Sequence, residues 1–83
     1  MNTFRLSNIT LKEFRKFLQC EGLNFVKIEG DHERWEKKGL LRPVVFSNGV
    51  NPVPELFIQN TFKNLGFTRK TFIVAFNKCM NKK

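Results

Sequence analysis

The sequence contains few of the residues on which metal or redox chemistry depends. It has one histidine, two cysteines and no tyrosine. Cys20 and Cys79 lie far apart, with no Cys-x-x-Cys pair and no histidine at ligand spacing, whereas a structural zinc site normally needs four such ligands. We therefore expect no metal site and no cofactor. In predicted helices, two such thiols act as small hydrophobic side chains, although a disulfide between them is also compatible with the sequence.

Long hydrophobic runs are also absent. The longest apolar run is residues 72–76, far short of the ~20 residues that a helix needs to cross a bilayer. The first ten residues lack the apolar segment of a signal peptide. These absences predict a protein that does not enter membranes and that works in the reducing cytoplasm.

Acidic residues are in the minority. Seven Asp and Glu stand against 15 Lys and Arg, which gives a formal net charge of +8. Such an excess on a small domain creates a positive potential that attracts polyanions. RNA, DNA, an anionic membrane or an acidic protein would each suit it, and the plain alternative is a basic domain with no polyanion partner.

Hydrophobic periodicity divides the chain, residues 1–83, into the elements of a single small domain. Thr10 and Glu13 form the pattern of a capping box, and Gly22 provides a helix stop. We expect an extended lead over 1–9, a helix over 11–21, strands over 23–29, 32–37 and 43–46, a helix from 54 to 65, a last helix from 69 to 80 and a frayed end. The order predicts an α+β fold, with helices on one face of a three-stranded antiparallel sheet.

Ten phenylalanines dominate the candidate core. Those at helical spacing are expected to pack inside the domain, because each buried ring removes a large apolar area from water; they are Phe14, Phe17, Phe62, Phe72 and Phe76. Phe25, Trp35 and Phe46 fall in predicted strands. Burial is the favoured interpretation for these three, and stacking on RNA bases is the alternative.

Strand alternation sorts the residues of the second strand into two sets. Trp35 points one way together with Glu33 and Lys37, while His32, Arg34 and Glu36 point the other way. If Trp35 faces the helices, His32 faces solvent. The sequence leaves open which face Trp35 occupies.

The order of these motifs resembles that of the HicA (YcfA-like) toxin family. The first helix ends at Glu21-Gly22, the second strand opens with residues 30–35, GDHERW, and the tail contains residues 65–68, LGFT. HicA proteins typically have Gly-Ser-His at the second strand and Leu-Gly-x-[Ser/Thr] in the tail. The likeness covers roughly residues 10–76. Asp31 departs from the usual pattern, because serine is common at that position.

The resemblance implies a dsRBD-like α-β-β-β-α fold with a short extra C-terminal helix. It also implies an mRNA interferase, a metal-independent endoribonuclease of a type II toxin-antitoxin pair. The partners implied are mRNA and a HicB-like antitoxin, with a monomer when alone and a hetero-oligomer with the antitoxin. His32 carries over as the catalytic histidine, and Gly30 and Asp31 as the turn that supports it.

The residues around His32 suit RNA cleavage without a metal. The substrate's own 2′-hydroxyl is the nucleophile, and histidine is a natural base because its ordinary pKa of about 6.5 lies near working pH. Arginine and lysine bind phosphate oxygens. The candidate phosphate-binding residues are Lys27, Arg34, Lys37, Lys38 and Arg42. Helix cations either bind phosphates too or are ordinary solvated charges; these are Lys12, Arg15, Lys16, Lys63, Arg69 and Lys70.

Two other functions fit the same features. A non-catalytic RNA-binding domain would use the charge and the fold and would not need the histidine. An interaction protein would use its basic surface to meet an acidic partner. A cleavage assay separates the first from the enzyme, and growth arrest on expression separates the second.

Overall fold

The computed structural model describes residues 8–81 of the 83-residue chain. The elements, in chain order, are α1 (Leu11–Cys20), β1 (Asn24–Glu29), β2 (His32–Glu36), β3 (Val44–Ser47), α2 (Glu55–Asn64) and α3 (Arg69–Met80). This confirms the predicted order and the α+β class. Residues 1–7 of the expected extended lead over 1–9, and residues 82–83 of the expected frayed end, lie outside the described residues.

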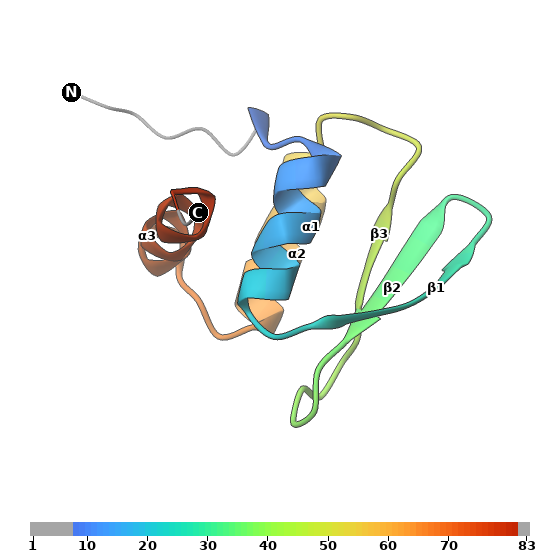
Figure 1. Cartoon of the computed structure of the whole chain (residues 1–83), viewed down its shortest axis with the longest axis horizontal. Helices are drawn as coiled ribbons and strands as arrows, with labels where there is room; N and C mark the ends of the chain where they lie inside the picture. The colour runs from blue at the N-terminus through green and yellow to red at the C-terminus, as the bar shows by residue number, and fades with distance from the viewer. Residues whose placement is uncertain (1–7, 82–83) are drawn as a thin grey trace.

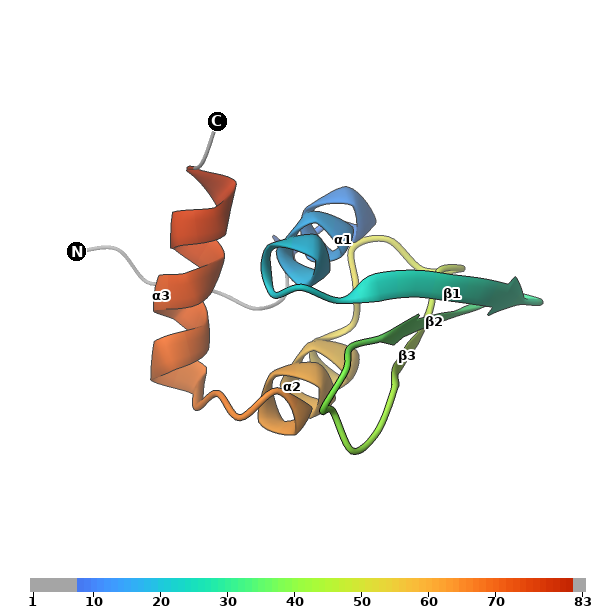
Figure 2. The same cartoon turned by 60° about the horizontal axis from the view of Figure 1, so that its bottom comes forward.

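The domain is built in three layers. The sheet is antiparallel with strand order β1-β2-β3. Helices α1 and α2 lie side by side against one face of it, and α3 packs on their far side (Figures 1 and 2). The last helix, predicted over 69–80, is found at Arg69–Met80, and its 12 residues make it longer than α1 or α2, with 10 each. Its length gives α3 an apolar face that closes the core.

The start and end of α1 follow from its sequence. The Thr10 hydroxyl accepts a hydrogen bond from the Glu13 backbone N–H at 3.1 Å, and the Glu13 carboxylate accepts one from the Thr10 N–H at 3.0 Å. These bonds form the predicted capping box and satisfy backbone donors that the first turn leaves free. At the other end, Gly22 has φ +85°, a conformation that side chains other than glycine's disfavour. The predicted stop at Gly22 is therefore confirmed.

The core is made of aromatic rings from all three helices and two strands. All five helical phenylalanines that the periodicity selected are buried. Phe72 lies at the centre, with its ring 5.0 Å from that of Phe17 and 5.1 Å from that of Phe62. Trp35 and Phe46 are buried as expected. The aromatic core thus ties the helices to β2 and β3.

Phe25 is an exception, because half of its side chain, 49%, is exposed. Its ring contacts that of Trp35, with centroids 5.7 Å apart. Strand β1 forms one edge of the sheet, however, and all six of its residues are exposed. The expected burial of Phe25 is therefore wrong: its ring shields one side of Trp35 and leaves its own outer side in solvent.

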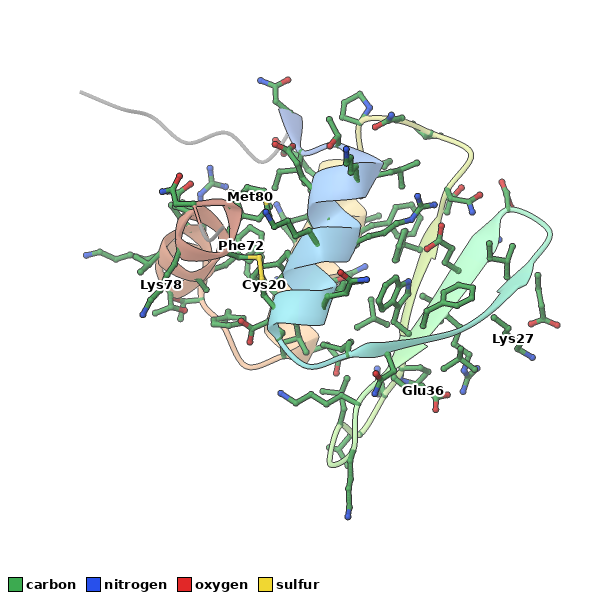
Figure 3. The ribbon with its side chains drawn as sticks, viewed as in Figure 1. Cys20, Lys27, Glu36, Phe72, Lys78 and Met80 are labelled. Carbon is green, nitrogen blue, oxygen red and sulfur yellow. A yellow bond between two sulfur atoms is a disulfide. The ribbon has the colours of Figure 1, made fainter. Side chains whose placement is uncertain are left out.

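Cys20 and Cys79 are joined in a disulfide, with their Cα atoms 6.2 Å apart. The bond links the end of α1 to α3 (Figure 3). Of the two interpretations that the sequence left open, the covalent one is found. Disulfides persist mainly in oxidising compartments and are rare in the reducing cytosol, so the bond does not favour the cytoplasmic setting expected from the sequence. Within residues 8–81, no helix is long and apolar enough to span a bilayer.

Candidate functional site

A tight turn places His32 at one end of the central strand. Glu29 of β1 pairs with His32 of β2, so only Gly30 and Asp31 form the connection. Gly30 has φ +61°, which suits a two-residue hairpin whose first residue must adopt a positive φ. On its other side His32 pairs with Ser47 of β3. The histidine is therefore flanked by a neighbouring strand on both sides.

The side chain of His32 lies on the solvent face of the sheet. Glu33 and Trp35, at 1% and 4% exposure, point into the core. Because successive strand residues alternate, His32 lies on the opposite face, and its side chain is 56% exposed. This answers the question that the sequence left open: Trp35 faces the helices and His32 faces solvent.

Asp31 holds the imidazole from one side. The Nδ1 atom of His32 lies 3.0 Å from Oδ1 of Asp31. The other oxygen of Asp31 accepts a hydrogen bond from the Ser47 hydroxyl at 3.3 Å, and its backbone carbonyl accepts one from the Asn48 N–H at 2.6 Å. A neutral imidazole that donates through Nδ1 leaves Nε2 as a proton acceptor. The arrangement therefore presents one basic nitrogen to solvent.

Two of the candidate phosphate-binding residues share the face of His32. Lys27 pairs directly with Arg34 in the sheet register. Each has a carboxylate partner: Lys27 lies 3.3 Å from Glu29, and Arg34 lies 2.8 Å from Glu36. Exposed ion pairs of this kind contribute about 0–1 kcal/mol, so a phosphate can compete for both cations. Sequence reasoning did not identify Glu29, the carboxylate opposite His32.

The other three candidate cations lie away from His32. Lys37 and Lys38 follow the far end of β2, and Arg42 belongs to the loop that leads to β3. Five residues of extended chain separate His32 from Lys37, which at about 3.3 Å per residue is about 16 Å. The structure therefore brings Lys27 and Arg34 to the histidine and gathers the other cations at the opposite end of the sheet.

Beneath the site, a buried carboxylate anchors β2 to the rest of the domain. Glu33 accepts hydrogen bonds from the Trp35 indole at 3.1 Å, from the Asn48 amide at 2.9 Å and from the Arg15 guanidinium, whose Nε is 3.1 Å away. Burial raises the pKa of Glu33, but the hydrogen bonds from Arg15, Asn48 and Trp35 outweigh this and lower it. The hydrogen bond to Glu33 correspondingly raises the pKa of Arg15.

Part of this network could have been found in the sequence. Alternation already put Glu33 on the same side as Trp35, and a carboxylate facing a core needs a cation or several donors. Which cation would serve depends on how α1 lies across the sheet, and no local pattern encodes that. The cation that pairs with Glu33 is Arg15. From the sequence alone, Arg15 was interpreted as either a solvated charge or a phosphate-binding one.

Among residues 8–81, no group of three or more His, Cys, Asp or Glu side chains is arranged to hold a metal ion. No family model, curated protein or solved structure matches this chain. The likeness to HicA toxins therefore rests on the sequence motifs, and the site must be judged by its own geometry.

Proposed function

We propose that this protein is an endoribonuclease that cleaves mRNA without a metal, with His32 as the general base, and that it acts as the toxin of a type II toxin-antitoxin pair. One observation carries the proposal. The imidazole stands on the open face of the sheet, its Nδ1 is 3.0 Å from Asp31, and Arg34 and Lys27 form the next register pair on that face. The motif likeness to HicA toxins supports the same conclusion.

The chemistry follows from this geometry. Nε2 of His32 takes the proton of a ribose 2′-hydroxyl, whose oxygen then attacks the adjacent phosphorus. The bond from phosphorus to the 5′-oxygen breaks, and the leaving oxygen takes a proton from the surrounding water. The products are a 2′,3′-cyclic phosphate and a 5′-hydroxyl. Arg34 and Lys27 stabilise the negative charge that builds up on the phosphate oxygens.

A base of this kind accelerates cleavage by roughly 10²–10⁴-fold. The side chain of His32 is more than half exposed, so its surroundings exclude little water and add little electrostatic stabilisation. We therefore expect slow turnover.

An acidic, HicB-like antitoxin is the partner in this proposal. The net charge of +8 favours an acidic protein. Apolar side chains of β1 are about half exposed, among them Phe25, Val26 and Ile28, and a partner that covered them would remove apolar surface from water. The cytoplasmic location belongs to the same proposal, and there reduction would convert the disulfide to two thiols.

The direct test incubates the purified protein with a labelled RNA oligonucleotide in excess chelator. We expect slow cutting that leaves 2′,3′-cyclic phosphate ends, and no cutting of the same oligonucleotide made with 2′-deoxyribose. Cutting of the deoxy strand, or 3′-hydroxyl products, would contradict the mechanism. In cells, induction should halt growth, and co-expression of the neighbouring antitoxin gene should restore it.

A non-catalytic RNA-binding domain is the second candidate, and one observation favours it. The cations nearest His32 are engaged with carboxylates, while Lys37 and Arg42 form no ion pair among residues 8–81. A non-catalytic domain would bind RNA with an affinity that falls steeply as the salt concentration rises, and the RNA would remain uncut for hours. The cleavage assay above separates the two functions.

A further inference from the structure

The end of the sheet opposite His32 carries two adjoining hollows. The smaller, about 250 Å³, is bordered by Arg34, Lys37 and the loop between β2 and β3. The larger, about 670 Å³, lies between that loop and α2, where Asn60, Lys63 and Asn64 border it. The loop residues Leu41, Arg42 and Pro43 line both. The two hollows therefore form a path that begins at Arg34, two residues from His32.

The charge along this path is positive and largely uncompensated. Its lining contains four cationic side chains, Arg34, Lys37, Arg42 and Lys63, and a single carboxylate, Glu36. Glu36 is engaged with Arg34. In residues 8–81 the other three cations have no ion-pair partner. A phosphate backbone would supply the missing negative charge.

The larger hollow also has features that suit a nucleobase. The Asn64 amide donates a hydrogen bond to the backbone carbonyl of Arg42 at 2.9 Å, which ties the loop to α2 at the edge of this hollow. Asn60 is exposed on the same wall, and amide side chains can bond base edges. Leu41, on the rim, is 98% exposed, an apolar surface against which a base can lie.

We propose that this path is an extended binding site for single-stranded RNA, in which Arg42 and Lys63 hold phosphates several nucleotides from the scissile bond at His32. The proposal rests on the proposed function for the choice of RNA. A single strand fits better than a duplex, because the path runs from Arg34 on the open face of the sheet, along the loop before β3, to the side of α2.

The separation of the two regions sets the length of RNA required. His32 and the beginning of the loop lie about 16 Å apart. A stacked strand rises roughly 3.4 Å per nucleotide, so about five stacked nucleotides, or fewer extended ones, cover the gap. A 12-nucleotide RNA can therefore extend from His32 to the larger hollow.

The test measures binding, so that it does not depend on cleavage. Fluorescence anisotropy is recorded with a 12-nucleotide RNA that carries 2′-fluoro groups and so lacks the nucleophilic hydroxyl. We expect Arg42→Gln with Lys63→Gln to weaken the 12-mer about tenfold and to reduce its salt slope by about 1.4, since each phosphate contact on a single strand contributes about 0.7.

The matched control removes two charges elsewhere, by Lys70→Gln with Lys78→Gln on α3, which lies far from the sheet (Figure 3). It should leave the affinity for the 12-mer within about twofold. Equal losses for the two variants, or equally tight binding of a 12-base-pair duplex, would overturn the extended site. If the protein binds in the expected way but does not cut RNA, only the proposed catalysis fails.

Discussion

At the scale of single residues, the two faces of β2 differ: one anchors the strand to the rest of the domain, and the other carries His32. Glu33 is buried and accepts hydrogen bonds from Arg15, Trp35 and Asn48. Its neighbour His32 lies on the opposite, open face. Because Glu33 fixes the strand to α1 and to the segment after β3, the position of the imidazole depends on a carboxylate on the other face of the sheet.

The lowered pKa of Glu33 makes a prediction about acid stability. Its carboxylate is ionised more easily in the folded chain than at its ordinary value of 4.5. The stabilisation is therefore fully present above about pH 4.5 and is lost as the pH falls through the lower folded value. The free energy of unfolding of wild type should exceed that of Glu33→Gln at pH 7, and this difference should shrink towards pH 3.

Urea unfolding of both proteins at several pH values provides the measurement. Glu29→Gln is the control, because Glu29 is an exposed carboxylate whose ion pair with Lys27 lies in solvent; its curve should follow that of wild type closely. If the free energies of unfolding of wild type and Glu33→Gln differ by the same amount at every pH, protonation of the buried carboxylate does not change the stability of the fold.

At the scale of elements, local signals placed the helices and the turns. The capping box at Thr10 and the glycine at 22 both act within a few residues, so the sequence alone was enough to find them. The alternation around Trp35 likewise identified the solvent face of β2 once one residue was known to be buried.

Longer-range features could not be predicted in the same way. The contact of Arg15 with Glu33 depends on how α1 crosses the sheet, and the bond between Cys20 and Cys79 depends on how α3 lies beside α1. The exposure of Phe25 follows from the edge position of β1. For the candidate site, the turn and the histidine were predictable, while the separation of Arg42 from His32 required the register of the sheet.

The β1–β2 hairpin provides a prediction about Gly30. No atom lies within 4 Å of a Cβ built on this glycine, so alanine meets no clash. The backbone conformation at φ +61° alone should cost about 1–2 kcal/mol. Gly30→Ala is therefore expected to lower the free energy of unfolding by that amount, measured in urea.

Gly30→Asn is the matched variant, because asparagine tolerates a positive φ better than alanine. It should recover much of the loss. An alanine variant as stable as wild type would mean that the turn is not needed in this form, and the placement of His32 would lose its structural basis.

At the scale of the whole molecule, the disulfide closes the domain from α1 to α3. The two cysteines are 59 residues apart in sequence, so the bond restricts most of the unfolded chain. Cys20 is exposed while Cys79 is buried, which gives a reductant access from the Cys20 side. The aromatic core beneath the bond packs independently of it, so reduction should weaken the fold without abolishing it.

Reduction should lower the free energy of unfolding by about 2–4 kcal/mol. Thermal or urea unfolding with and without a phosphine reductant measures this loss. The double variant Cys20→Ser with Cys79→Ser should have the stability of the reduced protein, and the reductant should not change it. Unchanged stability in reductant would show that the bond does not constrain the chain. A folded reduced form is also what a cytoplasmic toxin would require.

The most direct test of the account compares His32→Ala with wild type in single-turnover RNA cleavage and in RNA affinity. We expect the cleavage rate to fall roughly 10²–10⁴-fold, with affinity and thermal stability nearly unchanged, because the imidazole is exposed and packs against little. Gln19→Ala, which shortens an exposed side chain on α1, should cut RNA as wild type does. Equal cleavage by His32→Ala and wild type would contradict the account.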